Sequence, residues 1–498
     1  MTDNAAVPSV TTEPTPAPTV PVDEAFLRIC EVEQRLDLLR HTVDGWTAWP
    51  LIRFEVSQRL TAVSFPHRRA MSRGQRVFLA LADLPRLIRI KNARLLVKTY
   101  SSGLIERRGD RYEDIWFDDV ILAAGSTFKV EMVNNPNFAA RSRRGLVRRD
   151  LASAALEIAA SLLSRRRASP AIQSVAGELG RVLREELGLA SVDEAWIGAR
   201  LRYFSAMKIV YAALLRRVRP KCVLVADSGE HALVAAAKET GSVALELQHG
   251  INDRSHAGYF WTGYAIPYRP IMPVPHRLLL YGEHWRRELD SDSFWGESLR
   301  VVGNPRIDRY RNVPGIRSKN ECTALFTTQG LDVERVTGFF RGFLQTLRRR
   351  VRLRLLIKLH PIHDTDKSIY LDALSSFHDQ VEVLAGDEGA STFDLLARAN
   401  LHISIASASH YDAIGLGVPT VILPFLTHEI VLPLYRAGHA HFVRTPEELC
   451  DLVLRWYELR VPEGAGEYYY KSGALPNILR ELELPASGES SCVVQSQP

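Results

Sequence analysis

The amino-acid sequence predicts an α/β protein with two Rossmann-like, doubly wound domains that face a cleft. Short apolar runs typical of buried strands alternate with helical patterns from residue 221 to about residue 445, as in parallel sheets that are covered by helices. A proline-rich stretch at 252–276 interrupts this alternation and is the best linker between the two domains. The length of 498 residues also suggests two to four domains.

The composition is that of an ordinary globular protein, with 46% hydrophobic and 24% charged residues. The five cysteines are scattered and form no CxxC pair, which argues against a zinc site or a secreted disulfide framework. The chain contains no run of about 18 apolar residues that would span a membrane. Its start lacks the basic and apolar segments of a signal peptide. We therefore expect a cytoplasmic protein.

The formal net charge is +6, and arginines gather in clusters at 68–76, 141–149, 165–167 and 348–354. Such clusters are usually a solvated surface, but basic helices in the first 170 residues can also attach to anionic lipid. We therefore expect peripheral attachment to the inner face of the cytoplasmic membrane. No nucleic-acid-binding motif accompanies the charge, so nucleic acid is not an expected partner.

The sequence divides into five segments. The two ends, 1–23 and 485–498, have the composition of disordered tails. Residues 24–90 show apolar residues at helical spacing and predict a helical N-terminal region. Residues 91–265 are expected to form the N-terminal Rossmann-like domain, and 276–484 the C-terminal one. The apolar runs that we interpret as strands are 93–100, 116–125, 221–229, 242–250, 277–284, 299–308, 322–330, 353–361, 381–386, 401–407 and 419–425.

In the C-terminal half, polar residues follow the predicted strands, where ligands of parallel sheets bind. Lys358, His360 and Pro361 end one strand, and a histidine there can donate to a phosphate oxygen. The stretch from Ser407 to Asp412, with Ser409 and His410, combines hydroxyl groups with the start of a helix, which can cradle an anion. Thr328 and Gly330 form a shorter turn of this kind. The alternatives are a loop histidine with satisfied hydrogen bonds and a simple helix N-cap.

In the N-terminal half, three residues are candidates for a general base. His249 ends the strand ELQHG at the expected lip of the cleft, where an imidazole suits proton transfer near neutral pH. Glu230 and Asp227 end the neighbouring strand, and either carboxylate could be the base or orient His249, while Asp227 could instead cap the next helix. No DxD turn is a credible metal site, because the acidic pair in WFDDV lies in the wrong half. We expect no metal ligands and a metal-independent reaction.

The order of the motifs QHG, GNPRID, KLHP and a serine-rich turn before GVPTV resembles bacterial surface-polysaccharide glycosyltransferases of the GT-B fold. The most similar groups are capsule Kdo-type transferases, polysialyltransferases and CDP-glycerol glycerophosphotransferases, and UDP-N-acetylglucosamine 2-epimerases share the architecture. The resemblance covers about 221–445, and its specificity lies in the order and spacing of short motifs.

The resemblance implies that a CMP- or UDP-linked nucleotide-sugar donor, as a substrate and without a further cofactor, binds the C-terminal domain. His360 would contact the nucleotide phosphate, Ser407 and Ser409 the same nucleotide, and Asn304 of GNPRID would join them. His249 and Gly250 would form the catalytic-base turn, beside a lipid-linked or polysaccharide acceptor. The expected function is glycosyl transfer to a capsule or lipopolysaccharide glycan. The alternatives are a nucleotide-sugar 2-epimerase, a CDP-glycerol-type polyol-phosphate transferase and a non-catalytic component of polysaccharide assembly.

Overall fold

The computed structural model describes residues 22–61, 72–99, 105–108, 110–132, 149–165, 169–189, 192–290, 293–311, 320–361, 363–385 and 390–483. Both predicted tails lie mostly or wholly outside these ranges, as do most of the arginine clusters at 68–76, 141–149 and 165–167. Within the described ranges, every helix is too short or too polar to cross a bilayer. The four described cysteines are buried thiols without a disulfide.

The first domain is built on a seven-stranded parallel sheet with the order β11-β10-β9-β8-β3-β6-β7. The chain starts in the middle at β3, runs outward to β7, and then returns to β8 and continues to the other edge, so the sheet is doubly wound. The strand bounds are β3 (Leu95–Thr99), β6 (Thr127–Glu131), β7 (Leu151–Ala152), β8 (Cys222–Val225), β9 (Val243–Leu247), β10 (Arg277–Leu280) and β11 (Leu299–Val301).

The second domain contains a six-stranded parallel sheet with the order β14-β13-β12-β15-β16-β17. The order in which the chain adds strands also reverses in the middle of this sheet, between β12 and β15. Open parallel sheets bind ligands at such a point. The strand bounds are β12 (Cys322–Thr327), β13 (Leu353–Lys358), β14 (Val381–Leu384), β15 (Leu401–Ser404), β16 (Thr420–Ile422) and β17 (His441–Phe442). The two sheets give the α/β class and the pair of Rossmann-like domains expected for a GT-B protein.

Alternating strand residues face opposite layers of helices. In β3, Leu95 and Val97 share a core cluster with Val120, Ile121 and Ile478, whereas Leu96 shares another with Leu156, Met207 and Leu233. The helices of the first domain are α1 (Val22–Arg35), α2 (Pro50–Thr61), α3 (Arg73–Ala82), α4 (Leu84–Ile88), α5 (Asp118–Ala124), α7 (Ala154–Ser164), α8 (Pro170–Glu185), α9 (Glu194–Val218), α10 (His231–Glu239), α11 (Glu283–Leu289) and α12 (Pro305–Arg311). Two short hairpins, β1 (Thr42–Val43) with β2 (Trp46–Thr47) and β4 (Ile105–Arg108) with β5 (Arg111–Asp114), complete it.

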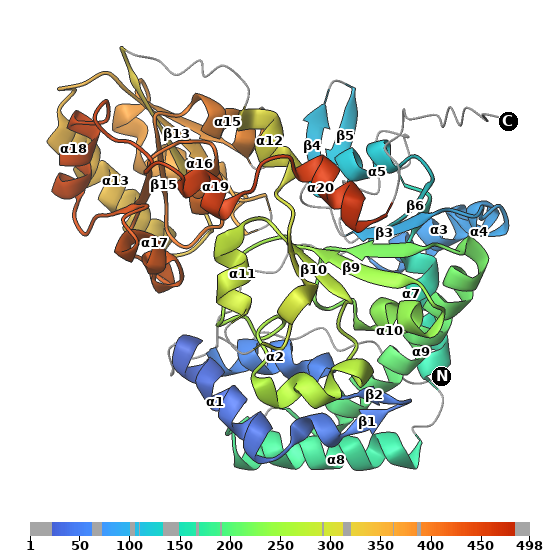
Figure 1. Ribbon diagram of the computed structural model, residues 1–498. Helices are drawn as coiled ribbons and strands as arrows, with labels where there is room; N and C mark the ends of the chain where they lie inside the picture. The colour runs from blue at the N-terminus through green and yellow to red at the C-terminus, as the bar shows by residue number, and fades with distance from the viewer. Residues whose placement is uncertain are drawn as a thin grey trace, which may run out of the picture.

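The second sheet is covered by α13 (Val333–Leu347), α14 (Lys367–Ala373), α15 (Thr392–Arg398), α16 (Ser409–Gly415), α17 (Leu432–Arg436) and α18 (Pro446–Leu454). The chain then runs through α19 (Ala465–Tyr469) and returns to the first domain as α20 (Ala474–Glu481). Figure 1 shows α20 beside α5, far from the second sheet. The chain therefore crosses between the domains twice.

Three sequence predictions differ from the structure. The runs at 277–284 and 299–308 belong to the first sheet, because β10 pairs in parallel with β9 and β11 pairs with β10. The proline-rich stretch 252–276 consequently lies inside the first domain, where part of it forms the 3₁₀ helix η3 (Gly263–Ile271). The run at 116–125 is not a strand but contains helix α5, which begins with two aspartates and buries Val120 and Ile121. Acidic residues in a first helical turn favour a helix.

Candidate active site

A cavity of about 70 Å³ lies between the two domains, at the carboxyl ends of strands from both sheets. The first domain contributes residues that follow β9, β10 and β11, and the second contributes residues of α15 and α16. A volume of this size holds roughly two water molecules, whereas small-molecule sites usually measure about 300–1,000 Å³. The cavity is therefore smaller than the sites that usually hold a small molecule. The lining residues are Ile115, Trp116, His249, Gly250, Tyr281, Trp285, Asn304, Arg306, Phe393, Ala408, Tyr411, Asp412 and Tyr470.

His249 is the predicted base candidate that reaches this cavity. It follows β9 directly, lies half-buried, and has the ring of Trp116 edge-on at 6.3 Å between centroids. Burial lowers the pKa of His249 below its ordinary value, against the opposing charge of Asp227. The imidazole is therefore neutral at pH 7, the form that can accept a proton.

A buried chain of polar groups connects to the His249 ring. The Tyr259 hydroxyl donates to the Glu246 carboxylate and lies 3.3 Å from Nδ1 of His249. Burial raises the pKa of Glu246 well above its usual range. The sequence places Glu246 at the same strand end as His249, but nothing in the sequence identifies Tyr259 as its partner.

Gln248 holds the neighbouring cavity wall in place. Its Nε2 donates to the Gly250 carbonyl at 2.7 Å, and its Oε1 accepts from the Tyr281 backbone N–H at 2.8 Å. Gly250 and Tyr281 both line the cavity. One buried amide therefore fixes the turn after β9 against the end of β10.

The structure places Glu230 and Asp227 outside the residues that line the cavity. The Glu230 carboxylate forms a buried ion pair with Lys98 on β3, and burial raises the pKa of Glu230. Asp227 accepts from the Gly229 backbone N–H at 2.7 Å and so closes the turn after β8 instead of capping α10. Asp227 acts on His249 through charge, as one of the groups that set the pKa of its imidazole.

Three predicted turns of the second domain meet where the strand order of its sheet reverses, between β12 and β15. Thr328 Oγ1 accepts from the His360 backbone N–H at 3.1 Å, and the side chain of Gln329 accepts from the Ala406 N–H at 2.9 Å. Gly330 has a φ of +71°, and a Cβ there would lie 2.3 Å from the His363 carbonyl oxygen. The turn after β12 therefore requires glycine at this position, and it holds the turns after β13 and β15 in register.

The two residues that flank His360's turn have different surroundings. Lys358 is buried and donates to the Ala385 carbonyl at 2.7 Å, so it holds β13 against the end of β14. Pro361 is half-buried in the turn after His360. His360 itself accepts from the His363 N–H at Nδ1 and stacks on that ring at 4.6 Å. None of the three lines the interdomain cavity.

The serine-rich turn after β15 is held by its own hydrogen bonds. Ser407 Oγ accepts from the backbone N–H and the hydroxyl of Ser409, and the Ser409 hydroxyl also lies 2.8 Å from Thr327 Oγ1. His410 is fully buried between Thr420 and the Ile405 carbonyl, and burial lowers its pKa to about 4. Ser409 and His410 therefore anchor α16 to the sheet, while Ala408 and Asp412 of the same segment reach the cavity.

Asp412 and Asn304 are predicted residues that line the cavity, and Arg306 joins them. Burial raises the pKa of Asp412 to about 6, against a hydrogen bond from Tyr470 at 2.6 Å and the charge of Arg306. Asn304 Oδ1 accepts from the Arg306 backbone N–H at 2.9 Å, and the guanidinium lies 3.9 Å from the Phe393 ring centroid. Arg306 is a cation of the site that the sequence analysis did not identify, although it is part of the GNPRID motif.

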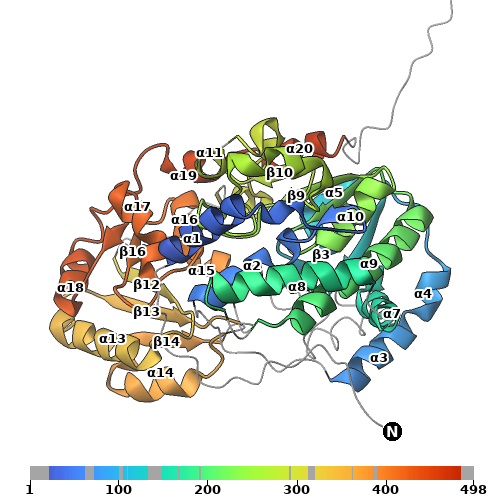
Figure 2. The same ribbon diagram turned by 90° about the horizontal axis from the view of Figure 1, so that it is seen from below.

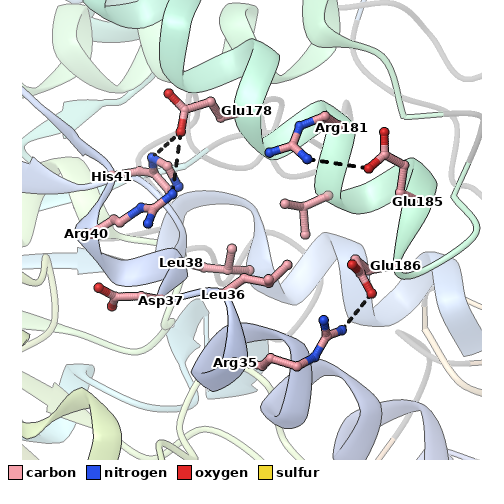
Figure 3. Close-up of a pocket in the computed structure, with 11 residues that line it drawn as sticks. Arg35, Leu36, Asp37, Leu38, Arg40, His41, Glu178, Arg181, Glu185 and Glu186 are labelled. Carbon is pink, nitrogen blue, oxygen red and sulfur yellow. Dashed lines mark hydrogen bonds and ion pairs between the residues drawn. The ribbon is translucent and has the colours of Figure 1, made fainter.

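A larger cavity of about 240 Å³ lies elsewhere, between the end of α1 and helix α8 (Figure 3). Its charged side chains form pairs with one another: Arg35 with Glu186 at 2.6 Å, His41 with Glu178 at 3.5 Å, and Arg181 with Glu185 at 3.5 Å. Figure 1 shows α1 and α8 along the opposite side of the first domain from α20 and the crossings. The pairing and the position favour the interdomain cavity as the candidate active site.

No group of three or more histidine, cysteine, aspartate or glutamate side chains with metal-binding geometry occurs among the described residues. No family model matches the sequence, and no curated protein is significantly similar to it. Solved structures do resemble the fold. The UDP-GlcNAc 2-epimerase from Neisseria meningitidis, bound to UDP-GlcNAc, is 14% identical, with 78% of this chain and 98% of that chain covered and a TM-score of 0.47.

Two further solved structures match the same share of this chain. MurG from Acinetobacter baumannii is 10% identical, with 78% of this chain and 98% of that one covered and a TM-score of 0.42. The lipopolysaccharide outer core galactosyltransferase WaaB is 11% identical, with the same coverage and a TM-score of 0.41. Similarities at this level do not transfer a substrate to this chain. Its fold is established by its own strand order and register.

Proposed function

We propose that the protein is a glycosyltransferase that transfers a sugar from a nucleotide-activated donor to a growing cell-surface glycan. The observation that carries the proposal is the interdomain cavity. There, the neutral imidazole of His249 from one domain and Asp412 from the other line the same space, together with the cationic Arg306. Such a pair of facing domains can hold donor and acceptor on opposite sides of one reacting centre.

In the proposed reaction, an acceptor hydroxyl oxygen attacks the anomeric carbon of the donor sugar. The bond from that carbon to the donor phosphate oxygen breaks, and its electron pair leaves with the nucleotide. The hydroxyl proton moves to the unprotonated ring nitrogen of His249, and the positive charge of Arg306 offsets the developing charge of the leaving phosphate. We propose that this transfer does not depend on a metal ion.

We propose that the donor, UDP- or CMP-linked, occupies the second domain beside the turns that follow β12, β13 and β15. Support comes from the position of these turns where the strand order of the sheet reverses, and from His360 and Ser407 within them. The acceptor, a lipid-linked glycan or polysaccharide of the capsule or lipopolysaccharide type, would enter along the first domain. Such donors and acceptors place the reaction in the cytoplasm, at the inner face of the membrane.

Calorimetric titration with UDP, CMP and their sugar derivatives tests the donor site. Arg306→Gln is expected to weaken binding of the preferred nucleotide about tenfold or more, because a hydrogen bond to a charged group contributes about 1.5–3 kcal/mol. Arg309→Gln is the matched control, since Arg309 lies one turn further along α12 and pairs with Asp119 and Glu113. If the protein binds none of these nucleotides, the proposal is contradicted.

A product assay separates the alternative reaction. A 2-epimer of the donor sugar as product, with no transfer, would identify an epimerase instead.

A further inference from the structure

Helices α3 and α4 present an apolar face that the described residues leave exposed. Val77, Leu81, Leu84 and Ile88 follow one another at spacings of four, three and four, so they share one side of the helix pair. Between 48% and 74% of the surface of these four side chains is exposed, and Phe78 beside them is 55% exposed. Another side of α3 already packs on the protein through Leu79 and Ala80. The helix pair therefore carries more apolar surface than the fold requires.

The surroundings of this apolar face are strongly basic. Exposed cations flank it along 72–92, namely Arg73, Arg76, Arg86, Arg89 and Lys91. The only acid in this range is Asp83, which is buried, paired with Arg86 and Arg149, and bonded to the Ala152 backbone N–H at 2.7 Å. No exposed carboxylate of the segment offsets the positive charge.

The face also lies far from the candidate active site. A capping box between Ser72 and Gln75 starts α3 and satisfies hydrogen bonds of its first turn within the helix itself. Figure 2 shows α3 and α4 at the edge of the first domain, at the opposite end of the molecule from the second domain. A large flat partner could cover this end without closing the interdomain cleft.

We propose that α3 and α4 lie in the interface of an anionic lipid bilayer, with the apolar face among the acyl chains and the basic residues at the phosphates. An apolar stripe flanked by arginine is the arrangement of helices that bind membrane surfaces. A second copy of this chain is a poorer occupant, because two such faces would oppose like charges. The inference deepens the proposed function by naming the surface that would hold the protein at the inner face of the membrane, and its test does not depend on which reaction the cleft performs.

Co-sedimentation of the full chain with vesicles tests the proposal. We expect binding to vesicles of phosphatidylcholine mixed with phosphatidylglycerol at low salt, and none to phosphatidylcholine alone. Leu81→Ser combined with Ile88→Ser should reduce the partition coefficient by tenfold or more, because each buried CH₂ favours the membrane by about 0.8 kcal/mol. Leu27→Ser on α1, where the side chain is 67% exposed, is the matched control and should bind like the unchanged protein.

The charged residues are tested in the same assay. Arg89→Gln combined with Lys91→Gln should lower binding at low salt by roughly tenfold or more, because each basic residue at an anionic surface contributes about 1 kcal/mol. Arg349→Gln, an exposed arginine of the second domain that pairs with Asp379, is the control. Three outcomes overturn the proposal: no binding to anionic vesicles, binding that the apolar variant leaves unchanged, or a dimer in sedimentation velocity that the apolar variant dissociates.

Discussion

At the scale of single residues, the neutral state of His249 determines what the site can do. Burial holds the pKa of His249 below 6.5, and a general base works only in its unprotonated form. As the pH falls through the pKa of His249 in the free enzyme, the imidazole gains a proton and loses the lone pair that accepts the proton of the acceptor hydroxyl. We therefore expect kcat/KM to be level at neutral pH and to fall only below pH 6.5.

In the proposed reaction, the hydroxyl of Tyr259 positions the base, because it links His249 to Glu246. Tyr259→Phe removes that link and should lower kcat on the order of tenfold, since a small misplacement of a reacting group can cost up to about 10²-fold. The donor KM should stay nearly constant, because Tyr259 does not line the cavity. Steady-state kinetics would measure both values.

Tyr268→Phe is the matched control for Tyr259→Phe, since Tyr268 donates its hydroxyl to Asp37 away from the cavity. It should leave kcat unchanged. A Tyr259→Phe enzyme that raises KM without lowering kcat would instead assign Tyr259 to substrate binding or to structure.

At the scale of elements, the two crossings between the domains pack directly on each other. Gly303, just after β11, has a φ of +96°, and a Cβ there would lie 2.1 Å from the Lys471 carbonyl oxygen on the returning chain. The segment that leaves the first domain can therefore pack against the returning segment only if residue 303 is glycine. This contact connects the end of the first sheet to the segment that leads into α20.

Gly303→Ala should destabilise the protein by more than the backbone strain alone, which costs roughly 1–2 kcal/mol for a non-glycine residue in the left-handed region. Gly438→Ala provides the comparison, because Gly438 has a φ of +73° but a Cβ added there would meet no atom within 4 Å. Thermal unfolding of both variants gives the difference. Equal losses of stability would mean that the crossings do not constrain each other.

Elements were predictable to different degrees for physical reasons. The strand-end turns at Thr328, His360 and Ser407 could be expected to meet, because the carboxyl ends of neighbouring parallel strands share one edge, and hydrogen bonds connect these turns in the structure. The membership of β10 and β11 could not be read from the sequence. An apolar run predicts a buried strand, but the sheet it joins is decided by long-range pairing.

At the scale of the whole molecule, the sequence predicted two Rossmann-like domains, and the two parallel sheets confirm this fold. The side chains that surround the cavity were harder to predict. Arg306, Trp116 and Tyr470 come from segments far apart in the chain, and only the packing of the domains brings them together. Conversely, Ser409 and His410 stand out in the sequence, yet the fold uses them to anchor a helix.

The central claim is that His249 is the base of a transfer reaction in the interdomain cleft. The turnover of His249→Ala and Glu230→Gln under donor saturation tests this claim most directly. His249→Ala should lower kcat by about 10²–10⁴-fold, the usual contribution of general-base catalysis, with donor affinity nearly unchanged. Glu230→Gln should stay within a few-fold, because Glu230 is paired with Lys98 outside the cavity. A severe loss in Glu230→Gln with a mild one in His249→Ala, or no severe loss in either variant, would contradict the account.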